Sequence, residues 1–150
     1  MFIFDVDGSL SDGGIYVGND GELFKRFDVK DGFAVNSLAD EGYLSAIITG
    51  RQSEIVEKRA KRLRITAVWQ GNPDKRGAYK ELKEKFSLSD EEIAFVGDDL
   101  IDLPIMVQTG LPIAVADAAE EVKERSLLVT KARGGHGAVR EAAGAVSGGS

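Results

Sequence analysis

The stretch FIFDVDG, residues 2–8, decides the fold of this chain, because an apolar run there ends in two aspartates and a glycine. The run predicts a short buried strand, whose C-terminal end brings the carboxylates of Asp5 and Asp7 into one small volume. Two carboxylates that close repel each other unless a divalent cation, a shared proton or covalent chemistry compensates them. Alone, the motif is equally compatible with two solvated turn aspartates before a glycine.

Length, charge and composition limit the classes of protein to consider. The 150 residues are enough for one domain with a substantial core. A net charge of -6 and a pI near 4.9 argue against nucleic acid as a partner, since binding it needs a basic face. The chain has no cysteine, which excludes disulfides, thiolate metal sites and cysteine nucleophiles. No run reaches the roughly 18 apolar residues of a membrane span and no leader precedes Asp5, so we expect no membrane partner and a cytoplasmic location.

Short apolar runs alternate with amphipathic stretches along the chain, a pattern typical of α/β proteins. We predict a doubly wound, mostly parallel sheet of the Rossmann-like type with helices on both faces. The predicted strands cover residues 2–6, 44–48, 66–69, 93–96, 112–115 and 127–129, and the predicted helices cover residues 33–41, 53–63, 76–86, 101–109, 118–125 and 138–145.

One interval departs from this alternation. Residues 15–17 and 22–27 flank the turn sequence GNDG, residues 18–21, and predict a β-hairpin that projects from the end of the first strand. No linker or repeat marks a second domain. We therefore predict one domain over residues 1–150, with the hairpin at about 13–28 and a flexible tail at 147–150.

Four polar clusters follow predicted strands. They are DVDG (residues 5–8), TGR (49–51), Lys75, and GDDLID (97–102). In an open α/β sheet, ligands bind beyond the carboxyl ends of the strands, so we expect these clusters to meet at one site. Any one of them is compatible with an ordinary strand-to-helix turn, where Asp, Thr, Gly and Asn are common. Four in succession favour a functional site.

The residue types in these clusters suit phosphoryl transfer. Carboxylate and carbonyl oxygens are the ligands of Mg²⁺, which keeps several waters and a substrate phosphate, and Asp5 and Asp98 are the expected direct ligands. The Thr49 hydroxyl, the backbone amides of Thr49 and Gly50 and the Lys75 ammonium are placed to hold phosphate oxygens. A carboxylate beside Mg²⁺ can form an aspartyl-phosphate, and an aspartate two residues further on can protonate the leaving alkoxide and then activate water.

In this order the four clusters resemble the four motifs of the haloacid dehalogenase superfamily of phosphatases, from residue 2 to about residue 143. The resemblance implies a role for each motif residue. It implies Asp5, Asp7, Thr49 and Lys75 as catalytic residues; Asp5, Asp7 (through its carbonyl) and Asp98 as metal ligands; Thr49, Gly50 and Lys75 as phosphate ligands; and Asp99 and Asp102 as residues that orient Lys75 or a metal-bound water from behind.

The closer resemblance is to the 3-deoxy-D-manno-octulosonate 8-phosphate phosphatases, which carry no cap domain. It rests on DGGIY (residues 12–16), FDVKDG (27–32), IITGR (47–51), WQG (69–71) and GGHGAVRE (134–141). Those enzymes remove phosphate from an eight-carbon keto sugar acid destined for lipopolysaccharide. They form tetramers in which neighbouring subunits wall the active site, so the resemblance implies a homotetramer and a sugar-acid phosphate substrate.

The sequence itself leaves no room for a cap. The interval after the first motif holds only the hairpin, and the interval between residues 50 and 75 holds only one helix and one strand. The crevice of a monomer would stand open, so a partner surface is needed to exclude water and to read a sugar. The apolar hairpin is a candidate for that surface; the alternative is a hairpin folded flat on its own domain.

Substrate recognition depends on basic residues near the phosphate loop. The carboxylate of a keto sugar acid favours a guanidinium, and Arg51 and Arg59 are candidates, although either is also compatible with a solvated helix residue. The resemblance implies further substrate contacts in the stretch 28–32, namely Asp28, Lys30, Asp31 and Gly32. It also implies that Arg133 and the loop 134–138 reach the active site of the same or an adjacent subunit. Relatives often carry arginine at the position of His136. The extension that they carry past the last helix is short or missing here.

Three alternatives remain. A phosphatase of a nine-carbon, sialic-acid-like 9-phosphate is a close relative, but members with that preference tend to replace the arginine at position 51. A signalling receiver domain also offers aspartate, threonine, lysine and a metal site, yet it places the acidic pair first and the phosphate acceptor on a later strand. A catalytically silent module paired with a sugar-activating enzyme is disfavoured because every motif residue is present.

Overall fold

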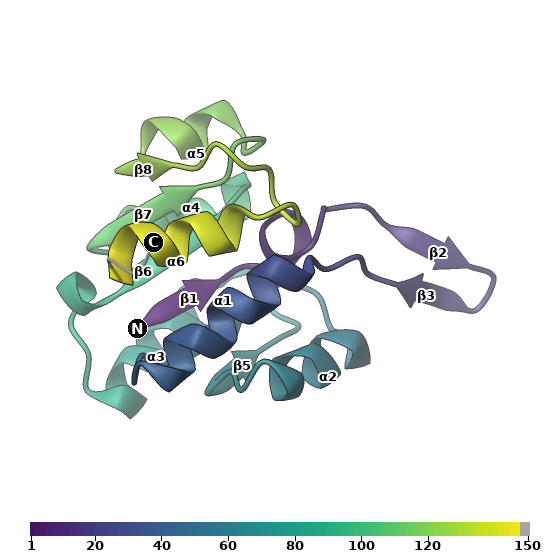
Figure 1. Ribbon diagram of the computed structural model, residues 1–150, viewed down its shortest axis with the longest axis horizontal. Coiled ribbons are helices and arrows are strands. Elements are labelled where there is room, and N and C mark those ends of the chain that lie inside the picture. Colours follow the sequence, from purple (N-terminus) through teal and green to yellow (C-terminus); the bar gives the residue numbers. More distant parts are fainter. Residues whose placement is uncertain (148–150) are drawn as a thin grey trace.

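A six-stranded parallel sheet forms the centre of the computed structural model, which describes residues 1–147 (Figure 1). Its strands lie in the order β5-β4-β1-β6-β7-β8, and every neighbouring pair is parallel. The strands are β1 (Phe2–Phe4), β4 (Ser45–Ile48), β5 (Ala67–Trp69), β6 (Ala94–Gly97), β7 (Leu111–Ala114) and β8 (Leu128–Val129). This topology confirms the predicted doubly wound α/β fold.

Strand β1 lies inside the sheet because its side chains are apolar on both faces. Phe2, Ile3 and Phe4 are at most 1% exposed, as a strand covered on both sides requires. Phe4 pairs with Ile47 of β4 and with Val96 of β6. The residues that follow these three strands therefore lie side by side at one edge of the sheet.

Helices cover both faces of the sheet. They are α1 (Val29–Asp40), α2 (Glu54–Arg62), α3 (Arg76–Phe86), α4 (Leu103–Met106), α5 (Glu120–Glu124) and α6 (Ala138–Ser147). Helices α1 and α6 pack together on the near face in Figure 1, whereas α4 contacts α3, β6 and β7. Right-handed crossovers place α3 and α4 on the opposite face. None of the helices formed by the described residues has the length and apolar character needed to cross a membrane.

The end of β1 differs from the prediction. The strand stops at Phe4, two residues short of the predicted end, and the chain then forms a π-type turn over Val6–Leu10. Gly8 in this turn has a φ of 95°, a left-handed conformation that glycine adopts without strain. Asp5 still continues the ladder, because its N–H donates to the carbonyl of Val96 at 3.0 Å.

Two helix ends also differ from the prediction. Helix α1 begins four residues earlier than predicted because Asp28 caps it, its carboxylate accepting the backbone N–H of Lys30 at 2.7 Å. Helix α6 reaches Ser147, so this residue belongs to the helix rather than to the tail predicted at 147–150. Residues 148–150 lie outside the described residues.

The helices predicted over residues 101–109 and 118–125 are shorter than expected. A 3-10 turn over Leu100–Asp102 precedes α4, and Asp99 and Asp102 cap this turn reciprocally. Because this cap holds residues 100–102 in a 3-10 turn, the α-helix begins only at Leu103, and α4 is a single turn long.

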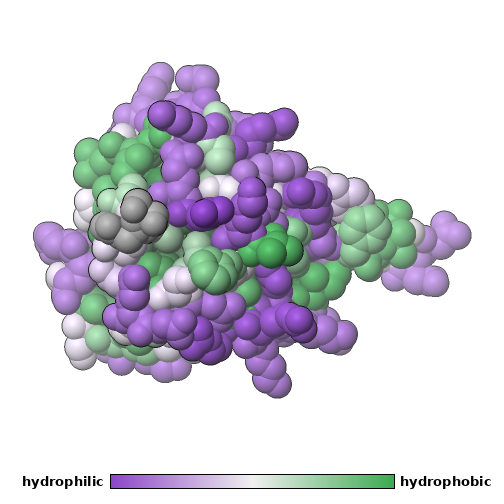
Figure 2. Space-filling model, in the orientation of Figure 1, coloured by the Kyte–Doolittle hydropathy of each residue, from purple (hydrophilic) through white to green (hydrophobic). Residues whose placement is uncertain are grey.

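The predicted hairpin is present and projects from the body of the molecule (Figure 1). Its antiparallel strands are β2 (Tyr16–Gly18) and β3 (Gly21–Phe24), and the rings of Tyr16 and Phe24 stack at 4.4 Å between centroids. Several apolar side chains on it are more than half exposed, namely Ile15, Val17, Leu23 and Phe24. Figure 2 shows these apolar groups along the arm, with a hydrophilic tip. The alternative of a hairpin folded flat on its own domain is therefore wrong.

Candidate active site

The four predicted clusters converge on one cleft at the carboxyl edge of the sheet, with a volume of about 230 Å³. Each cluster follows a different strand, β1, β4, β5 or β6, and the parallel register brings these ends together. The cleft is lined by Asp5, Asp7, Thr49, Gly50, Arg51, Pro73, Lys75, Asp98, Asp99 and Ile101. All four clusters that the sequence placed at strand ends thus contribute to one site.

A buried lysine forms the centre of this site. Lys75 is 1% exposed and lies just before α3, and its ammonium donates to Asp5 Oδ1 at 2.8 Å and to Asp102 Oδ1 at 2.6 Å. A buried ammonium is stable only when paired in this way. Burial alone would lower the pKa of Lys75, but the charges of Asp5 and Asp102 outweigh it and raise the pKa above its ordinary value. The lysine is therefore a fixed positive charge beside the predicted nucleophile.

Asp102 orients both Lys75 and the loop that contains Asp98 and Asp99. Its second oxygen accepts the backbone N–H groups of Asp98 at 3.0 Å and of Asp99 at 3.3 Å, and the side chain is fully buried. A Cβ at Gly97 would lie 2.8 Å from the same oxygen, so glycine is needed there. Both oxygens of Asp102 are thus used within the chain.

Asp98 supplies an oxygen that has no partner in the described part of the chain. Its Oδ1 is buried without a hydrogen bond, and carboxylate oxygens of Asp5, Asp98 and Asp102 lie within 4.8 Å of one another. Burial, followed by repulsion from Asp5, raises the pKa of Asp98. Burial, followed by repulsion from Asp102, raises the pKa of Asp5, although Lys75 opposes it. These groups fit a hard divalent cation, because it would satisfy the orphan oxygen and relieve the repulsion between the carboxylates.

Gly8 makes this carboxylate arrangement possible. A Cβ at Gly8 would overlap the carboxylate of Asp98, so a larger residue would displace it. The glycine after the two aspartates therefore serves the site as well as the turn.

The phosphate loop offers fewer backbone donors than predicted. The N–H of Thr49 donates to the carbonyl of Trp69 at 3.0 Å, so it is part of the hydrogen-bond ladder between β4 and β5. This corrects the expectation that the backbone of Thr49 holds a phosphate, and it leaves the Thr49 hydroxyl and the Gly50 N–H as candidates. A side chain at Gly50 would press on Ile101 and Pro73.

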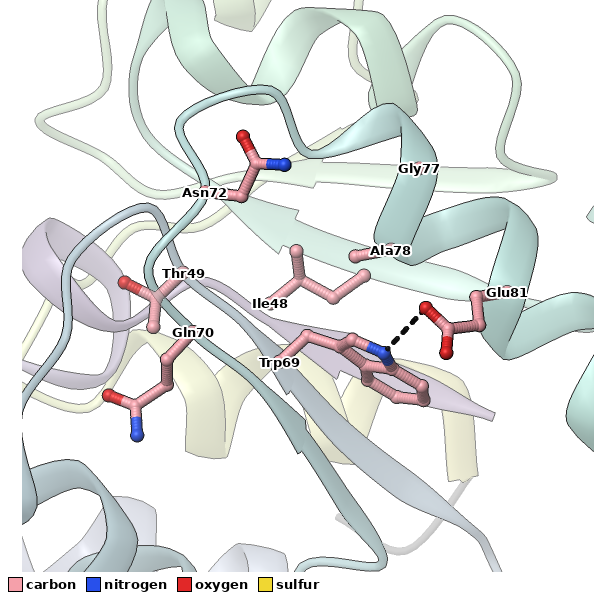
Figure 3. A pocket seen from close by; sticks show the side chains of 8 residues that line it. All are labelled: Ile48, Thr49, Trp69, Gln70, Asn72, Gly77, Ala78 and Glu81. Carbon is pink, nitrogen blue, oxygen red and sulfur yellow. Dashed lines mark hydrogen bonds between the residues drawn. The ribbon is translucent and has the colours of Figure 1, made fainter.

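A second pocket of about 260 Å³ adjoins the cleft and shares Thr49 with it (Figure 3). Trp69 lies between Ile48 and Glu81 in this view, and its indole N–H donates to a carboxylate oxygen of Glu81 at 3.3 Å. Gln70 and Asn72 also line the space, but the Gln70 amide accepts the backbone N–H of Ser53 at 3.0 Å and donates to Glu57 at 2.8 Å. The pocket therefore offers an aromatic wall next to the phosphate loop.

The predicted substrate residues of the stretch 28–32 do not line the cleft. Asp31 is buried and accepts the backbone N–H groups of Gly137 at 3.3 Å and Arg140 at 2.9 Å, so it caps the start of α6. Gly32 lies against the guanidinium of Arg59, where a Cβ would come within 2.6 Å. The structure gives Asp31 and Gly32 structural contacts, and substrate contacts of this stretch stay predictions.

The two predicted arginines differ in their surroundings. Arg51 is exposed at the rim of the cleft. The guanidinium of Arg59 lies 5.1 Å from the ring centre of Phe27, and its Nη2 donates to the carbonyl of Asp28 at 3.5 Å. Of these two arginines only Arg51 lines the cleft, whereas Arg59 of α2 packs against the residues that precede α1.

The loop 133–137 packs against the turn over Val6–Leu10. Its Gly135 N–H donates to the carbonyl of Ser9 at 3.0 Å, and a Cβ at Gly134 would overlap the carbonyl of Gly8. His136 is exposed. The loop therefore supports the backbone of the turn, and no contact of His136 with the cleft is seen among the described residues.

The sequence did not predict one contact of a candidate site residue. Asp7 Oδ1 accepts a hydrogen bond of 2.7 Å from Lys25, which lies at the base of the hairpin. Eighteen residues separate the two, and hairpin patterns do not indicate which side chain turns back to the body. The spacing therefore held no signal for this pair.

The fold and the cleft together are those of a hydrolase of the haloacid dehalogenase type, and the family model of haloacid dehalogenase-like hydrolases matches residues 65–141. The 3-deoxy-D-manno-octulosonate 8-phosphate phosphatase of Yersinia pestis is 48% identical over 141 residues, which cover 94% of this chain and 75% of that protein. The chain belongs to the family of these phosphatases, as the sequence resemblance predicted.

Solved structures agree with this assignment. The crystal structure of the Yersinia pestis phosphatase has a TM-score of 0.92 at 47% identity, over 95% of this chain and 77% of that one. The enzyme of Moraxella catarrhalis, solved in complex with a magnesium ion, a phosphate ion and a KDO molecule, has a TM-score of 0.91 at 41% identity, over 95% of this chain and 82% of that one.

Proposed function

We propose that this protein is a magnesium-dependent phosphatase that hydrolyses 3-deoxy-D-manno-octulosonate 8-phosphate through an aspartyl-phosphate on Asp5. The observation that carries the proposal is the buried cluster in which Lys75 holds the Asp5 carboxylate while Asp98 keeps an unpartnered oxygen. The names of relatives such as the Yersinia pestis enzyme support the substrate.

The carboxylates of Asp5 and Asp98 and the backbone carbonyl of Asp7 are the groups that would hold Mg²⁺. When bound, the ion supplies positive charge for the phosphate oxygens and for the charge that develops during transfer. Lys75, the Thr49 hydroxyl and the Gly50 N–H would hold the remaining phosphate oxygens.

Phosphoryl transfer then proceeds in two steps. A carboxylate oxygen of Asp5 attacks phosphorus while the bond to the sugar oxygen breaks, and Asp7 donates its proton to that oxygen. In the second step Asp7 takes a proton from water, the water oxygen attacks phosphorus, and the bond to Asp5 breaks to release phosphate. The hydrogen bond from Lys75 fixes the orientation of the Asp5 carboxylate for this in-line attack.

The keto-acid end of the substrate needs a cation away from the phosphate. Arg51 lies at the rim of the cleft, on the loop that holds Thr49, which suits a sugar that extends outward. The adjoining pocket with Trp69 and Asn72 adds a wall for the sugar carbons and hydroxyls. A nine-carbon 9-phosphate is the second candidate substrate, and Arg51 favours the eight-carbon one.

We infer that the protein works as a homotetramer. The projecting hairpin exposes Leu23 at 65% and Ile15 at 61%, which is unusual for an arm that stays in water. A neighbouring copy that covers these groups would also close the open cleft. Sedimentation tests this inference, and a fully active monomer would contradict it. The cytoplasmic location stays a prediction.

A phosphatase screen with Mg²⁺ tests the function. It compares the two keto-acid phosphates with hexose phosphates, and it uses Asp5→Asn as the matched inactive variant of the same size. We expect the highest kcat/KM for the eight-carbon substrate and loss of activity in the variant and in excess chelator. A preference for hexose phosphates, or activity that survives chelation, would contradict the proposal.

A further inference from the structure

Lys25 is a second buried lysine near the cleft, and the catalytic roles assigned above do not include it. It follows strand β3 at the base of the hairpin, and its side chain is only 3% exposed. Its ammonium lies 2.7 Å from Asp7 Oδ1 and 2.8 Å from Glu22 Oε2. The hairpin thus delivers a fixed cation to the predicted acid/base residue.

The contacts continue from Lys25 to the phosphate loop. Glu22 Oε1 accepts the hydroxyl of Ser53 at 2.8 Å, and this hydroxyl accepts the backbone N–H of Ile55 at 3.2 Å as the cap of α2. Ser53 lies two residues after Arg51. Asp7 is therefore tied through the hairpin to the helix that begins behind the phosphate loop.

A purely structural ion pair explains only part of this arrangement. Glu22 already provides a counter-charge for the buried ammonium, so anchoring the hairpin does not require Asp7. The Asp7 side chain is 25% exposed and lines the cleft, which leaves its carboxylate free to rotate unless something holds it. Lys25 supplies that restraint from the side of the hairpin.

We propose that Lys25 is a positioning residue for Asp7: its ammonium sets the direction of the acid/base carboxylate, and Glu22 holds the ammonium in place. The inference rests on the proposed function, in which Asp7 protonates the leaving oxygen and then activates water. Lys25 does not touch the reacting atoms. The hairpin is then part of the catalytic apparatus as well as a projecting arm.

The leaving group separates this role from a general loss of structure. A sugar alkoxide must receive a proton as its bond to phosphorus breaks, so its release depends on a well-placed Asp7. A p-nitrophenolate leaves without a proton. Attack by Asp5 on p-nitrophenyl phosphate should therefore survive when Asp7 is misplaced, whereas hydrolysis of the phospho-enzyme should still slow for both substrates.

The experiment compares Lys25→Met with the wild type in Mg²⁺, using single-turnover and steady-state rates with the eight-carbon phosphate and with p-nitrophenyl phosphate. We expect kcat for the sugar phosphate to fall about 10- to 100-fold, part of what general acid–base catalysis contributes, with KM changed less than about threefold. The burst of nitrophenolate should keep its rate while later turnover slows. Lys25→Arg should restore part of kcat, because it keeps the charge.

Two controls and several outcomes decide the matter. Lys80→Met removes an exposed lysine on α3 and should leave all rates unchanged, whereas Asp7→Asn should show the same leaving-group pattern as Lys25→Met but more strongly. Equal loss of the burst and of sugar-phosphate hydrolysis would mean that Lys25 supports only the fold, and a change confined to KM would make it a substrate ligand. Either result, or unchanged rates, would overturn the proposal. Absence of wild-type activity on every phosphate would instead overturn the proposed function.

Discussion

Lys75 and Lys25 are two buried lysines with the same local chemistry and different support. Each ammonium lies between two carboxylates at distances of 2.6 to 2.8 Å, and each contacts one aspartate of the first motif. Lys75 is carried by the core at the start of α3, whereas Lys25 is carried by a hairpin that projects from the body. The core of the fold therefore holds Asp5, the proposed nucleophile, whereas the projecting hairpin holds Asp7, the proposed acid/base residue.

Removing Lys75 should have the largest effect on both stability and activity. Lys75→Met leaves the carboxylates of Asp5 and Asp102 buried beside each other without their cation, which costs about 3–5 kcal/mol of unfolding free energy. Activity should fall by at least about a hundredfold, since a fixed positive charge at the transferring phosphate is lost. Urea unfolding and kcat measure the two effects. Near-normal stability would contradict the central place given to this lysine.

Binding of magnesium should have the next largest effect on the free energy of unfolding, and the size of this effect should depend on pH. Burial raises the pKa of Asp5 and of Asp98 in the metal-free protein, so the folded chain holds protons that the unfolded chain has released. The contribution of these two groups to the free energy of unfolding should therefore decrease as the pH rises from the unfolded value of 3.8 towards their raised native pKa.

Mg²⁺ at a hundred times its Kd should restore about 2.7 kcal/mol, and more of its benefit should appear at about pH 8 than at about pH 5. Urea unfolding at both pH values, with and without the ion, measures this difference. Stability that rises with pH in the absence of metal would contradict the account of the carboxylate cluster.

Removing Lys25 should cost less stability than removing Lys75. Lys25→Met leaves the carboxylates of Asp7 and Glu22 unpaired, but both are partly exposed and water can solvate them. We expect a loss of about 1–2 kcal/mol in urea unfolding. A loss as large as that of Lys75→Met would remove the distinction between core and arm.

A change on the hairpin surface should affect the stability of the chain least. Leu23→Glu places a charge on a side chain that is 65% exposed, so the unfolding free energy of the monomer should change by about 0.5 kcal/mol or less. The assembly should nevertheless dissociate in sedimentation. Leu127→Glu, on an exposed leucine away from the hairpin, is the matched control and should not change the assembly. Unchanged assembly in Leu23→Glu would mean that the hairpin is not the interface.

Lys75 and Lys25 also differ in whether the sequence could predict their contacts. The residues around Lys75 were predictable because each lies in a loop that follows a strand, and parallel strands bring such loops to one edge. Lys25 was not predictable, because its partner depends on how the hairpin leaves the body and not on strand order. Likewise, no pattern revealed that Asp31 caps α6, a contact across 106 or more residues. Fold class and strand ends follow local patterns, whereas these contacts arise from tertiary packing.

In the proposed mechanism Asp5 carries the phosphoryl group during turnover. The most direct measurement mixes enzyme with substrate and Mg²⁺, quenches in acid within one turnover, and locates the added phosphoryl group by mass spectrometry of peptides. We expect one phosphoryl group on the peptide that contains Asp5, more of it in Asp7→Asn when p-nitrophenyl phosphate is the substrate, and none in Asp5→Asn. A phosphoryl group on another residue, or turnover by Asp5→Asn, would contradict it.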